Sequence, residues 1–187
     1  MRIAAPADAA AVAEIYARYV RDTVISFELE PPDAAEMAGR IETTLPRFPW
    51  LVWEMEGQVA GYAYASAHRD RAAYRWSVDT TVYVAPFAHR RGVGMALSRT
   101  LARVLALQGF YRAYAGIALP NDASVALHEA VGYQPVGVYR DVGFKLGAWR
   151  DVGWWGLDLA QDAGAPGPIR PFSEALFDEA LRSGAVG

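Results

Sequence analysis

The sequence predicts an α/β or α+β fold in which helices cover a mixed sheet. Two helix-like segments precede a run of three strand-like segments near the middle of the chain, and helices and strands alternate only after that run. The last two strand-like segments follow one another with no helix between them. The expected order is therefore βααβββ followed by αβαββ, whereas a doubly wound sheet would alternate strands and helices throughout.

The first half of the chain is expected to hold two helices and a hairpin. Asp8 stands where it can cap the first helix, and a second helix is expected over residues 33–45. Residues 50–55 and 58–66 are typical of two strands, because the Glu56-Gly57 pair between them suits a tight turn. The apolar residues at helical spacing in the first helix are Val12, Ile15, Tyr16, Tyr19 and Val20.

The clearest strand prediction covers residues 76–84, where apolar and polar residues alternate. Asp79 and Tyr83 are therefore expected on the same face of the sheet. A glycine-rich loop follows at residues 89–94, and a helix then runs to Gly109, which ends it. The expected elements after it are a strand at 111–119, a helix at 121–131, and strands at 134–142 and 152–159.

The composition changes only near the end of the chain. We expect one domain over residues 1–160, followed by a Gly/Pro-rich C-terminal tail at 161–187. Residues 172–181 of this tail have an apolar face at helical spacing. The function of the tail cannot be read from the sequence.

The composition excludes several kinds of chemistry. The chain has 187 residues, 53% of them hydrophobic, with no cysteine and only three dispersed histidines, so we expect no metal site. Without cysteine there is no acetyl-cysteine intermediate either. A net charge of -3 favours neither nucleic acid nor an anionic membrane. The longest run free of Asp, Glu, Lys and Arg is the twelve residues 57–68, against the roughly 18 apolar residues of a membrane span, and we expect a cytoplasmic protein.

A strand, a loop with two glycines and a helix follow one another between Val82 and Leu97. Glycines let a ligand approach the backbone, and a helix start carries about half a positive charge, so this arrangement predicts an anion cradle. Alone, a Gly-x-Gly turn is as often only a turn. The loop lacks the Gly-Lys-Ser/Thr of nucleotide hydrolases and, at Leu97, the third small residue of the dinucleotide fingerprint. A pyrophosphate held beside a strand edge is the remaining interpretation.

Two motifs resemble those of a known family. His89-Arg90-Arg91-Gly92-Val93-Gly94 resembles the Gln/Arg-x-x-Gly-x-Gly/Ala motif of the GNAT superfamily of acyl-CoA-dependent N-acyltransferases. One helix and one strand later, the segment from Asn121 to Tyr133 resembles the family's Asn-x-x-Ser/Ala-x-x-Leu-Tyr-x-x-x-Gly-Phe motif. The pair is far more specific than either motif alone. The resemblance implies a mixed, mostly antiparallel sheet of about seven strands with helices on both faces, and acetyl-CoA as cosubstrate.

The resemblance narrows to the phosphinothricin acetyltransferase-like enzymes over about residues 3–159. It implies an N-acetyltransferase that acts on a small amino-acid-like amine of the phosphinothricin, methionine sulfoximine or methionine sulfone type. It also implies a homodimer, with Trp149, Trp154 and Trp155 as candidates for the dimer surface. The supporting segments are 48–52, 74–76, 81–84, 119–122, 142–145 and 149–155.

The same resemblance implies how acetyl-CoA binds. Main-chain groups of Val82 and Val84 are expected to pair with the pantetheine arm as an added strand would. Asn121 is expected to contact the arm near the thioester, with Ser124 close by. His89 departs from the family, which has Gln or Arg there, and its own contact with CoA is left open. The loop residues expected to hold the pyrophosphate are Arg90, Arg91, Gly92, Val93, Gly94, Met95 and Ala96.

The catalytic residues are also implied by the resemblance. Amine acetylation needs a base, a donor to the thioester carbonyl and an acid for the thiolate. The relatives have a His at the position of His128 and a carboxylate, usually Glu, at that of Asp79, which is one methylene shorter. We expect His128, with Asp79 or a water, to accept the ammonium proton, His128 or a water to return one to the thiolate, and the amide of Val84 to polarise the carbonyl. The alternative is that Asp79 is a polar residue on a strand face and His128 a helix histidine with satisfied hydrogen bonds.

The acceptor is expected to meet cations and aromatic rings. Arg71, Tyr74 and Lys145 fall at positions that resemble acceptor contacts, and Phe27 lies where the relatives have an aromatic wall. Arg offers a forked donor to an anionic side chain, and Lys a point charge. Tyr83 either lines this pocket or packs in the core. The alternative for Arg71 and Lys145 is that both are ordinary solvated charges.

Two other functions stay open at this stage. The first is acetylation of another amine, such as a peptide N-terminus. The second is a non-catalytic acyl-CoA-binding sensor, against which the intact Asp79, Asn121 and His128 argue. Because the chain has no cysteine, transfer is expected to be direct, from thioester to amine, in a ternary complex. His68 is interpreted as a loop residue.

Overall fold

A single seven-stranded sheet runs through the computed structural model, which describes residues 1–160 and 164–184. The strands lie in the order β1-β2-β3-β4-β5-β7-β6, and of the neighbouring pairs only β4 and β5 are parallel. The predicted mixed, mostly antiparallel sheet is therefore confirmed. The strands are β1 (Arg2–Ile3), β2 (Trp50–Met55), β3 (Gln58–Ala67), β4 (Ser77–Val84), β5 (Arg112–Ala118), β6 (Gln134–Lys145) and β7 (Ala148–Asp158).

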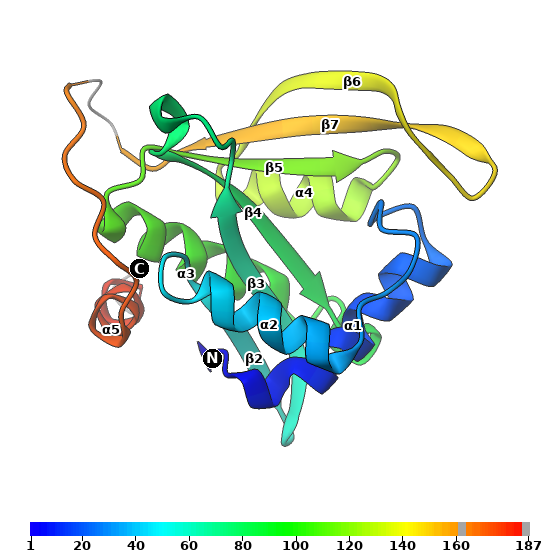
Figure 1. The fold of residues 1–187 in the computed structure, drawn as a ribbon, viewed down its shortest axis with the longest axis horizontal. Helices are drawn as coiled ribbons and strands as arrows, with labels where there is room; N and C mark the ends of the chain where they lie inside the picture. The colour runs from blue at the N-terminus through cyan, green and yellow to red at the C-terminus, as the bar shows by residue number, and fades with distance from the viewer. Residues whose placement is uncertain (161–163, 185–187) are drawn as a thin grey trace.

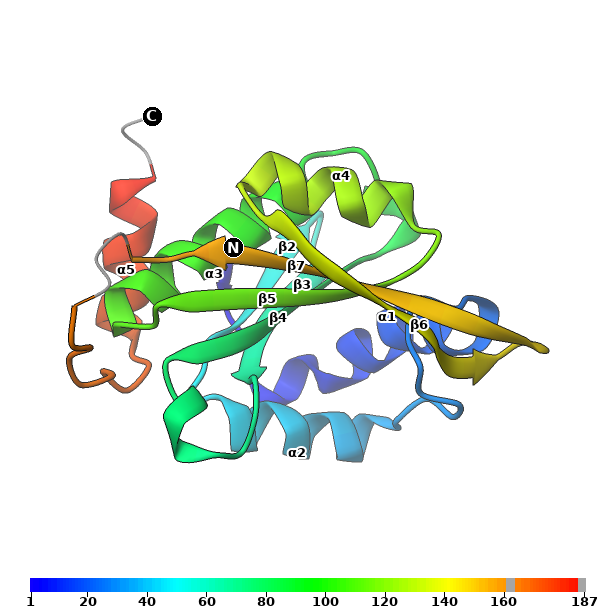
Figure 2. The ribbon, with the colours of Figure 1, turned by 90° about the horizontal axis from the view of Figure 1, so that it is seen from above.

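Helices cover both faces of the sheet, with α1 and α2 on one side and α3 and α4 on the other (Figure 2). Each side has its own hydrophobic cluster. The helices are α1 (Ala9–Asp22), α2 (Ala34–Thr44), α3 (Val93–Gln108), α4 (Asp122–Val131) and α5 (Glu174–Ser183). Three short 3-10 turns are η1 (Pro6–Asp8), η2 (Ala72–Tyr74) and η3 (Pro86–Ala88).

The two acidic residues before α1 and α2 behave differently. Asp33 caps α2, because its carboxylate accepts the amide of Glu36 at 2.8 Å. Asp8 does not cap α1 as predicted, since the turn η1 gives it a helical backbone. Its carboxylate instead accepts the amide of Ala5 at 2.8 Å and pairs with Arg2 at 2.6 Å. The backbone conformation therefore decides whether the carboxylate caps the helix: Asp33 is extended and caps α2, whereas Asp8 is helical and does not cap α1.

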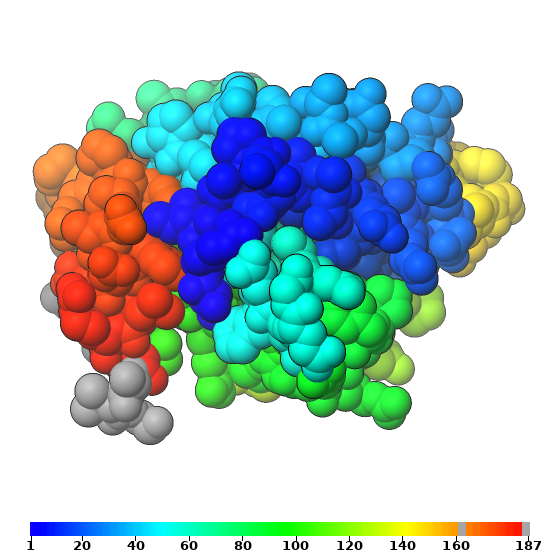
Figure 3. Space-filling model, turned by 90° about the horizontal axis from the view of Figure 1, so that it is seen from below, coloured from blue at the N-terminus to red at the C-terminus, as the bar shows by residue number. Residues whose placement is uncertain are grey.

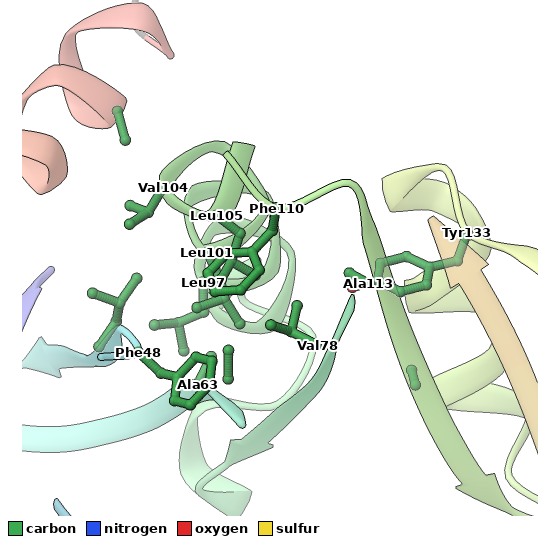
Figure 4. Packing of buried hydrophobic residues seen from close by; sticks show 14 of the residues in the cluster. Phe48, Ala63, Val78, Leu97, Leu101, Val104, Leu105, Phe110, Ala113 and Tyr133 are labelled. Atoms are coloured by element: carbon green, nitrogen blue, oxygen red, sulfur yellow. The ribbon is translucent and has the colours of Figure 1, made fainter. Parts of the chain in front are cut away.

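The larger core lies between α3 and the sheet (Figure 4). Leu97, Leu101 and Leu105 are almost fully buried, at the helical spacing seen in the sequence. The rings of Phe48 and Phe110 stack at the end of this layer, with centroids 5.8 Å apart. This packing fixes α3, and so its first turn, against β3 and β4.

The hairpin of β6 and β7 is longer than predicted. The sequence predicts strands at 134–142 and 152–159, whereas pairing continues to Lys145 and resumes at Ala148. The turn consists of Leu146 and Gly147, both with positive φ. Most of β6 is exposed, so no buried face imposes an alternating pattern from which its length could be read.

The segment after β7 packs against the domain. Phe177 and Ala180 of α5 belong to the core cluster of α3, and Ser173 caps α5 as an acceptor for the amide of Leu176. The indole N–H of Trp76 donates to the carbonyl of Gly167 at 2.9 Å. Figure 3 shows this segment, orange to red, lying beside the first residues of the chain, in blue.

Over the described ranges 1–160 and 164–184, no helix has both the length and the apolar character that crossing a bilayer requires.

Candidate active site

The two parallel strands of the sheet, β4 and β5, pair over only part of their length. Pairing of β4 with β5 is limited to Ser77–Asp79 against Arg112–Tyr114. Beyond Asp79, β4 continues beside β3 as far as Val84, while β5 continues beside β7 (Figure 1). The part of β4 from Thr80 to Val84 therefore has an edge free of β5, and we call the point where the two strands separate the vertex.

The main-chain groups on this edge face the opening. The amide of Ala85 donates to Ala60 on β3 at 2.8 Å, so its groups point toward β3. Because backbone groups alternate along a strand, those of Val84 and Val82 point the other way. An extended chain laid in the opening would find the main-chain groups of these two residues unpaired with β5.

A cradle of backbone amides lies beyond the end of β4. Gly92 precedes α3 with φ of 81°, and Arg90 also has a positive φ of 58°. The first helical bond is donated by the amide of Ala96 to Gly92 at 3.0 Å, so the amides of Val93, Gly94 and Met95 have no helical acceptor. No side chain caps them. Free amides at a helix start, beside the exposed Arg90 and Arg91, suit a phosphate group.

His89 turns away from this cradle. Its Nε2 lies 3.0 Å from the carbonyl of Val84 and 3.2 Å from the hydroxyl of Tyr19. The same hydroxyl donates to the Val84 carbonyl at 2.6 Å. The carbonyl of Val84 is thus occupied from the α1 side, and His89 helps to hold the end of the strand.

His128 is held in one orientation on α4. Asn121 caps this helix through its side-chain oxygen, which accepts the amide of Ser124 at 3.2 Å. Nδ1 of His128 lies 2.8 Å from the carbonyl of Ser124, so Nδ1 carries the proton and Nε2 keeps a lone pair. Burial lowers the pKa of His128, because the buried site disfavours the charged imidazolium. The ring is therefore neutral at pH 7.

A small hollow lies beside the vertex on the same face as α3 and α4. Tyr133 borders it with His128, and the two rings meet edge to face with centroids 5.1 Å apart. The hydroxyl of Tyr133 lies 2.7 Å from Oγ1 of Thr80, and burial raises its pKa to about 12, which keeps it protonated. Tyr133 was quoted in the second motif but was given no role. The lining residues are Thr80, Thr81, Val82, Ser98, Leu101, His128 and Tyr133.

Asp79 lies on the opposite face of the sheet from His128. Thr80, next to it on β4, points toward Tyr133 and α4, so Asp79 points to the face of α1 and α2. Its carboxylate lies 2.6 Å from Nδ1 of His68. Burial raises the pKa of Asp79, and the hydrogen bond with His68 partly offsets this rise. Asp79 is thus paired with His68, a residue that the sequence predicts only as part of a loop, and not with His128.

Three of the predicted acceptor residues lie at the surface. Arg71 and Tyr74 belong to the loop between β3 and β4, where both are exposed. Phe27, in the loop after α1, is 38% exposed and lies over Gly143 of β6. A Cβ at Gly143 would run into this ring, so a larger residue there would displace Phe27. Tyr83 packs against Tyr16 in the core, with ring centroids 5.0 Å apart.

Lys145 differs from its expected role. It is 5% exposed, and its Nζ donates to the carbonyls of Val20, Ser26 and Glu28 at 2.6, 2.6 and 2.9 Å. An ammonium group has three donors, so none remains for an acceptor. Lys145 is neither a solvated charge nor an available cation; it fastens the loop after α1 to the hairpin of β6 and β7.

The three tryptophans of the last hairpin lie in different environments. Trp149 is 61% exposed. Trp155 lies in the core, and its indole N–H donates to Glu129 at 3.2 Å, so it cannot form a dimer surface. Trp154 packs over Gly116 and Tyr139.

Transfer of an acyl group from a phosphate-bearing thioester requires an anion site at one end and a proton acceptor at the other, with a track between them. The opening beside β4 has free amides at one end and a neutral imidazole at the other, an arrangement that suits an acyl-CoA-dependent acyltransferase. The profile of the acetyltransferase (GNAT) domain matches residues 1–154. The chain therefore belongs to the GNAT family of acetyltransferases, as its two motifs suggested.

Similar proteins narrow the comparison. The phosphinothricin N-acetyltransferase of Streptomyces viridochromogenes is 43% identical over 174 residues, which are 93% of this chain and 94% of the relative. The L-methionine sulfoximine/L-methionine sulfone acetyltransferase of Salmonella typhimurium is 32% identical, over 87% of this chain and 96% of the relative. A phosphinothricin acetyltransferase from Sinorhizobium meliloti, solved with acetyl-CoA, superposes with a TM-score of 0.84 at 35% identity and covers 92% of both chains.

Proposed function

We propose that this acetyltransferase transfers the acetyl group of acetyl-CoA directly to the amine of a small amino-acid-like acceptor. The acceptor is of the phosphinothricin, methionine sulfoximine or methionine sulfone type, which the names of the relatives give. The observation that carries the proposal is the opening beside β4, with free amides at one end and the neutral His128 at the other.

The amides of the loop and first turn, from Arg91 to Ala96, hold the pyrophosphate, with Arg90 and Arg91 beside it. The pantetheine arm then runs along β4 from Val84 toward the vertex. Four residues of strand span about 13 Å, so the arm brings its thioester close to Thr80 and Val82. The hollow with His128 lies there as well.

This direction of the arm changes the assignment of one donor. Val84 is the strand residue nearest the cradle, and its amide suits the part of the arm closer to the phosphates. Val82 lines the hollow with His128, so its amide is better placed than that of Val84 to polarise the thioester carbonyl. Asn121 and Ser124 orient His128 through the first turn of α4 and border the arm from that side.

His128 moves a proton between the reacting atoms. After the neutral amine attacks, the nitrogen carries a surplus proton, which Nε2 of His128 accepts. The C–S bond then breaks, and the imidazolium returns this proton to the CoA thiolate. Tyr133 remains protonated throughout and donates a hydrogen bond within the hollow.

The acceptor binds on the Asp79 side of the vertex. Arg71 and Tyr74 supply a forked cation and a hydroxyl from the loop between β3 and β4, and Phe27 supplies an aromatic wall. The exposed Phe144, Leu146 and Trp149, at the end of the β6 and β7 hairpin, form the surface through which we expect two copies to pair.

One experiment tests the function. The purified chain is mixed with acetyl-CoA and a panel of amines, and thiol release is measured; without cysteine the protein adds no thiol signal. Turnover with methionine sulfone or phosphinothricin is the expected result. Turnover only with peptide N-termini would reassign the acceptor, and CoA binding without turnover would indicate a sensor. His128→Asn is expected to slow turnover about 100-fold at every pH.

A further inference from the structure

We propose that His68 and Asp79 form an imidazole–carboxylate pair that removes the proton from the acceptor's ammonium group before it attacks the thioester. The inference rests on the proposed function and names a residue to which that function assigned no role. Its basis is a single contact, from Nδ1 of His68 to Oδ1 of Asp79, at 2.6 Å.

The backbone sets this contact. His68 directly follows β3, and its amide donates to Ser77 at the start of β4. Asp79 lies two residues further along β4, on the face where the ring of His68 lies. With Nδ1 donating to the carboxylate, Nε2 keeps the lone pair and takes no partner among the described residues. The pair therefore offers a base, not only a structural hydrogen bond.

Aromatic side chains keep the imidazole in place. Tyr114 of β5 stacks on it, with ring centroids 4.6 Å apart and 28° between the planes. Tyr74 and Trp154 meet it edge to face at 6.0 and 6.1 Å. Because rings on three sides restrict rotation, the lone pair of Nε2 has a defined direction. The side chain retains 14% of its exposure, so the site is not closed to a ligand.

The pair lies at the vertex. Asp79 opposite Tyr114 is the last paired position of β4 and β5, and the free edge begins at the next residue. His128 borders the vertex from the α3 and α4 face, and His68 from the opposite face. The amine would thus meet His68 on one face of the sheet and the thioester His128 on the other, with the separated strands β4 and β5 between the two imidazoles.

The acceptor nitrogen loses two protons during the reaction, one to each imidazole. An amine enters as an ammonium ion and must lose one proton before its nitrogen can form the C–N bond; His68 accepts this proton and later releases it to water. The attacking nitrogen loses a second proton to His128, which passes it to the sulfur when the C–S bond breaks. The sum is one amide, one free CoA thiol and one proton released.

Charges of both signs lie around the pair. Asp79 faces the imidazole from β4, so an imidazolium formed there would have an anionic partner, and the charge of Arg69 also acts on the carboxylate of Asp79. Arg69, whose guanidinium donates to the His68 carbonyl at 2.7 Å, lies over Trp154 and not over the imidazole. The other titratable groups against the ring are the hydroxyls of Tyr74 and Tyr114, and β7 contributes only the indole of Trp154.

The test is the pH dependence of kcat/KM for the acceptor in His68→Asn. Asparagine keeps an N–H donor near Asp79 but cannot accept a proton. We expect kcat/KM to fall about 100-fold at pH 7, with the KM for acetyl-CoA unchanged. The difference in kcat/KM between the variant and the wild type should shrink as the pH rises, because more of the amine is then already neutral when it binds. Asp79→Asn should reproduce the effect, and the double variant should lose little more than either single one.

The controls separate the possible outcomes. His128→Asn should keep its deficit at high pH, because its proton transfer follows the attack. A fall in activity without change in the pH profile, together with a lower Tm, would show a merely structural His68 and overturn the pair. No thiol release by the wild-type chain with any amine would overturn the proposed function itself, and the pair with it.

Discussion

Nδ1 of His128 lies 2.8 Å from the carbonyl oxygen of Ser124, one turn earlier in α4. This bond fixes the tautomer of a buried imidazole, and burial lowers the pKa of the ring. The helix, whose first turn Asn121 caps, thus fixes the orientation and tautomer of the ring. The packing around α4 buries the ring and so lowers its pKa, against the hydrogen bond to Ser124, which raises it.

This lowered pKa predicts a loss of stability in acid. Below about pH 6.5 the unfolded chain protonates His128 readily, whereas the folded chain resists it, so the unfolded state binds more protons. The contribution is therefore complete above that pH and is lost as the pH falls toward the folded pKa. Urea unfolding at pH 7.5 and 5.5 should show a smaller loss of unfolding free energy in His128→Asn than in the wild type. An equal loss in both would contradict the prediction.

The cradle makes a prediction with a matched control. Gly92 has φ of 81° and open space around its Cβ position, so Gly92→Ala adds backbone strain of about 1 to 2 kcal/mol without a clash. Gly57, in the turn between β2 and β3, has φ of 77° and the same open surroundings. Both alanine variants should lower the Tm, but only Gly92→Ala should raise the KM for acetyl-CoA. A similar KM for acetyl-CoA in the two variants would show that Gly92 does not belong to the phosphate site.

Local signals account for what the sequence predicted well. The start of the second helix near Asp33, the stop at Gly109 and the Gly-containing turn at Glu56-Gly57 each depend on a few neighbouring residues, and each is found where expected. The cradle is of the same kind, because Gly92 and the first turn of α3 are adjacent in the chain. The family motifs added expected positions for the cofactor, which no local rule supplies and which stay a prediction.

Contacts between distant segments were not predictable in the same way. His68 meets Asp79 only because β3 and β4 pair in a particular register, and the sequence predicts no pairing between these two strands. The role of Lys145 depends on carbonyls more than 100 residues earlier in the chain. Neither partner leaves a pattern in the sequence. The chain reversal at Leu146 and Gly147 was missed because an exposed strand carries no periodic signal.

The segment after β7 is predicted to contribute to folding and not to catalysis. Phe177 is 5% exposed within the core cluster of α3, whereas Leu181 of the same helix is 38% exposed. Phe177→Ala should lower the free energy of unfolding by about 3 to 5 kcal/mol, and Leu181→Ala by about 0.5 kcal/mol. Thermal or urea unfolding measures the difference. A change in the KM for either substrate at a temperature where both variants are folded would argue for a role of α5 in the site.

Arg71 is predicted to act on the acceptor alone. It is exposed and the structure gives its side chain no hydrogen bond or ion pair within the described residues, so Arg71→Ala should leave the Tm unchanged. Loss of the forked cation should raise the KM for an anionic acceptor about tenfold, while the KM for acetyl-CoA stays the same. Arg71→Lys should recover only part of the effect. Equal changes in both KM values would contradict the assignment.

Lys145 is predicted to act on the fold first. Lys145→Met keeps the length of the side chain but leaves the carbonyls of Val20, Ser26 and Glu28 without their donor, and it should cost about 3 kcal/mol of unfolding free energy. Arg21→Met, an exposed change at the end of α1, is the control and should cost almost nothing. Because the freed loop carries Phe27, the KM for the acceptor should rise only together with the loss of stability. A rise in this KM in a variant as stable as the wild type would restore Lys145 as a direct acceptor contact.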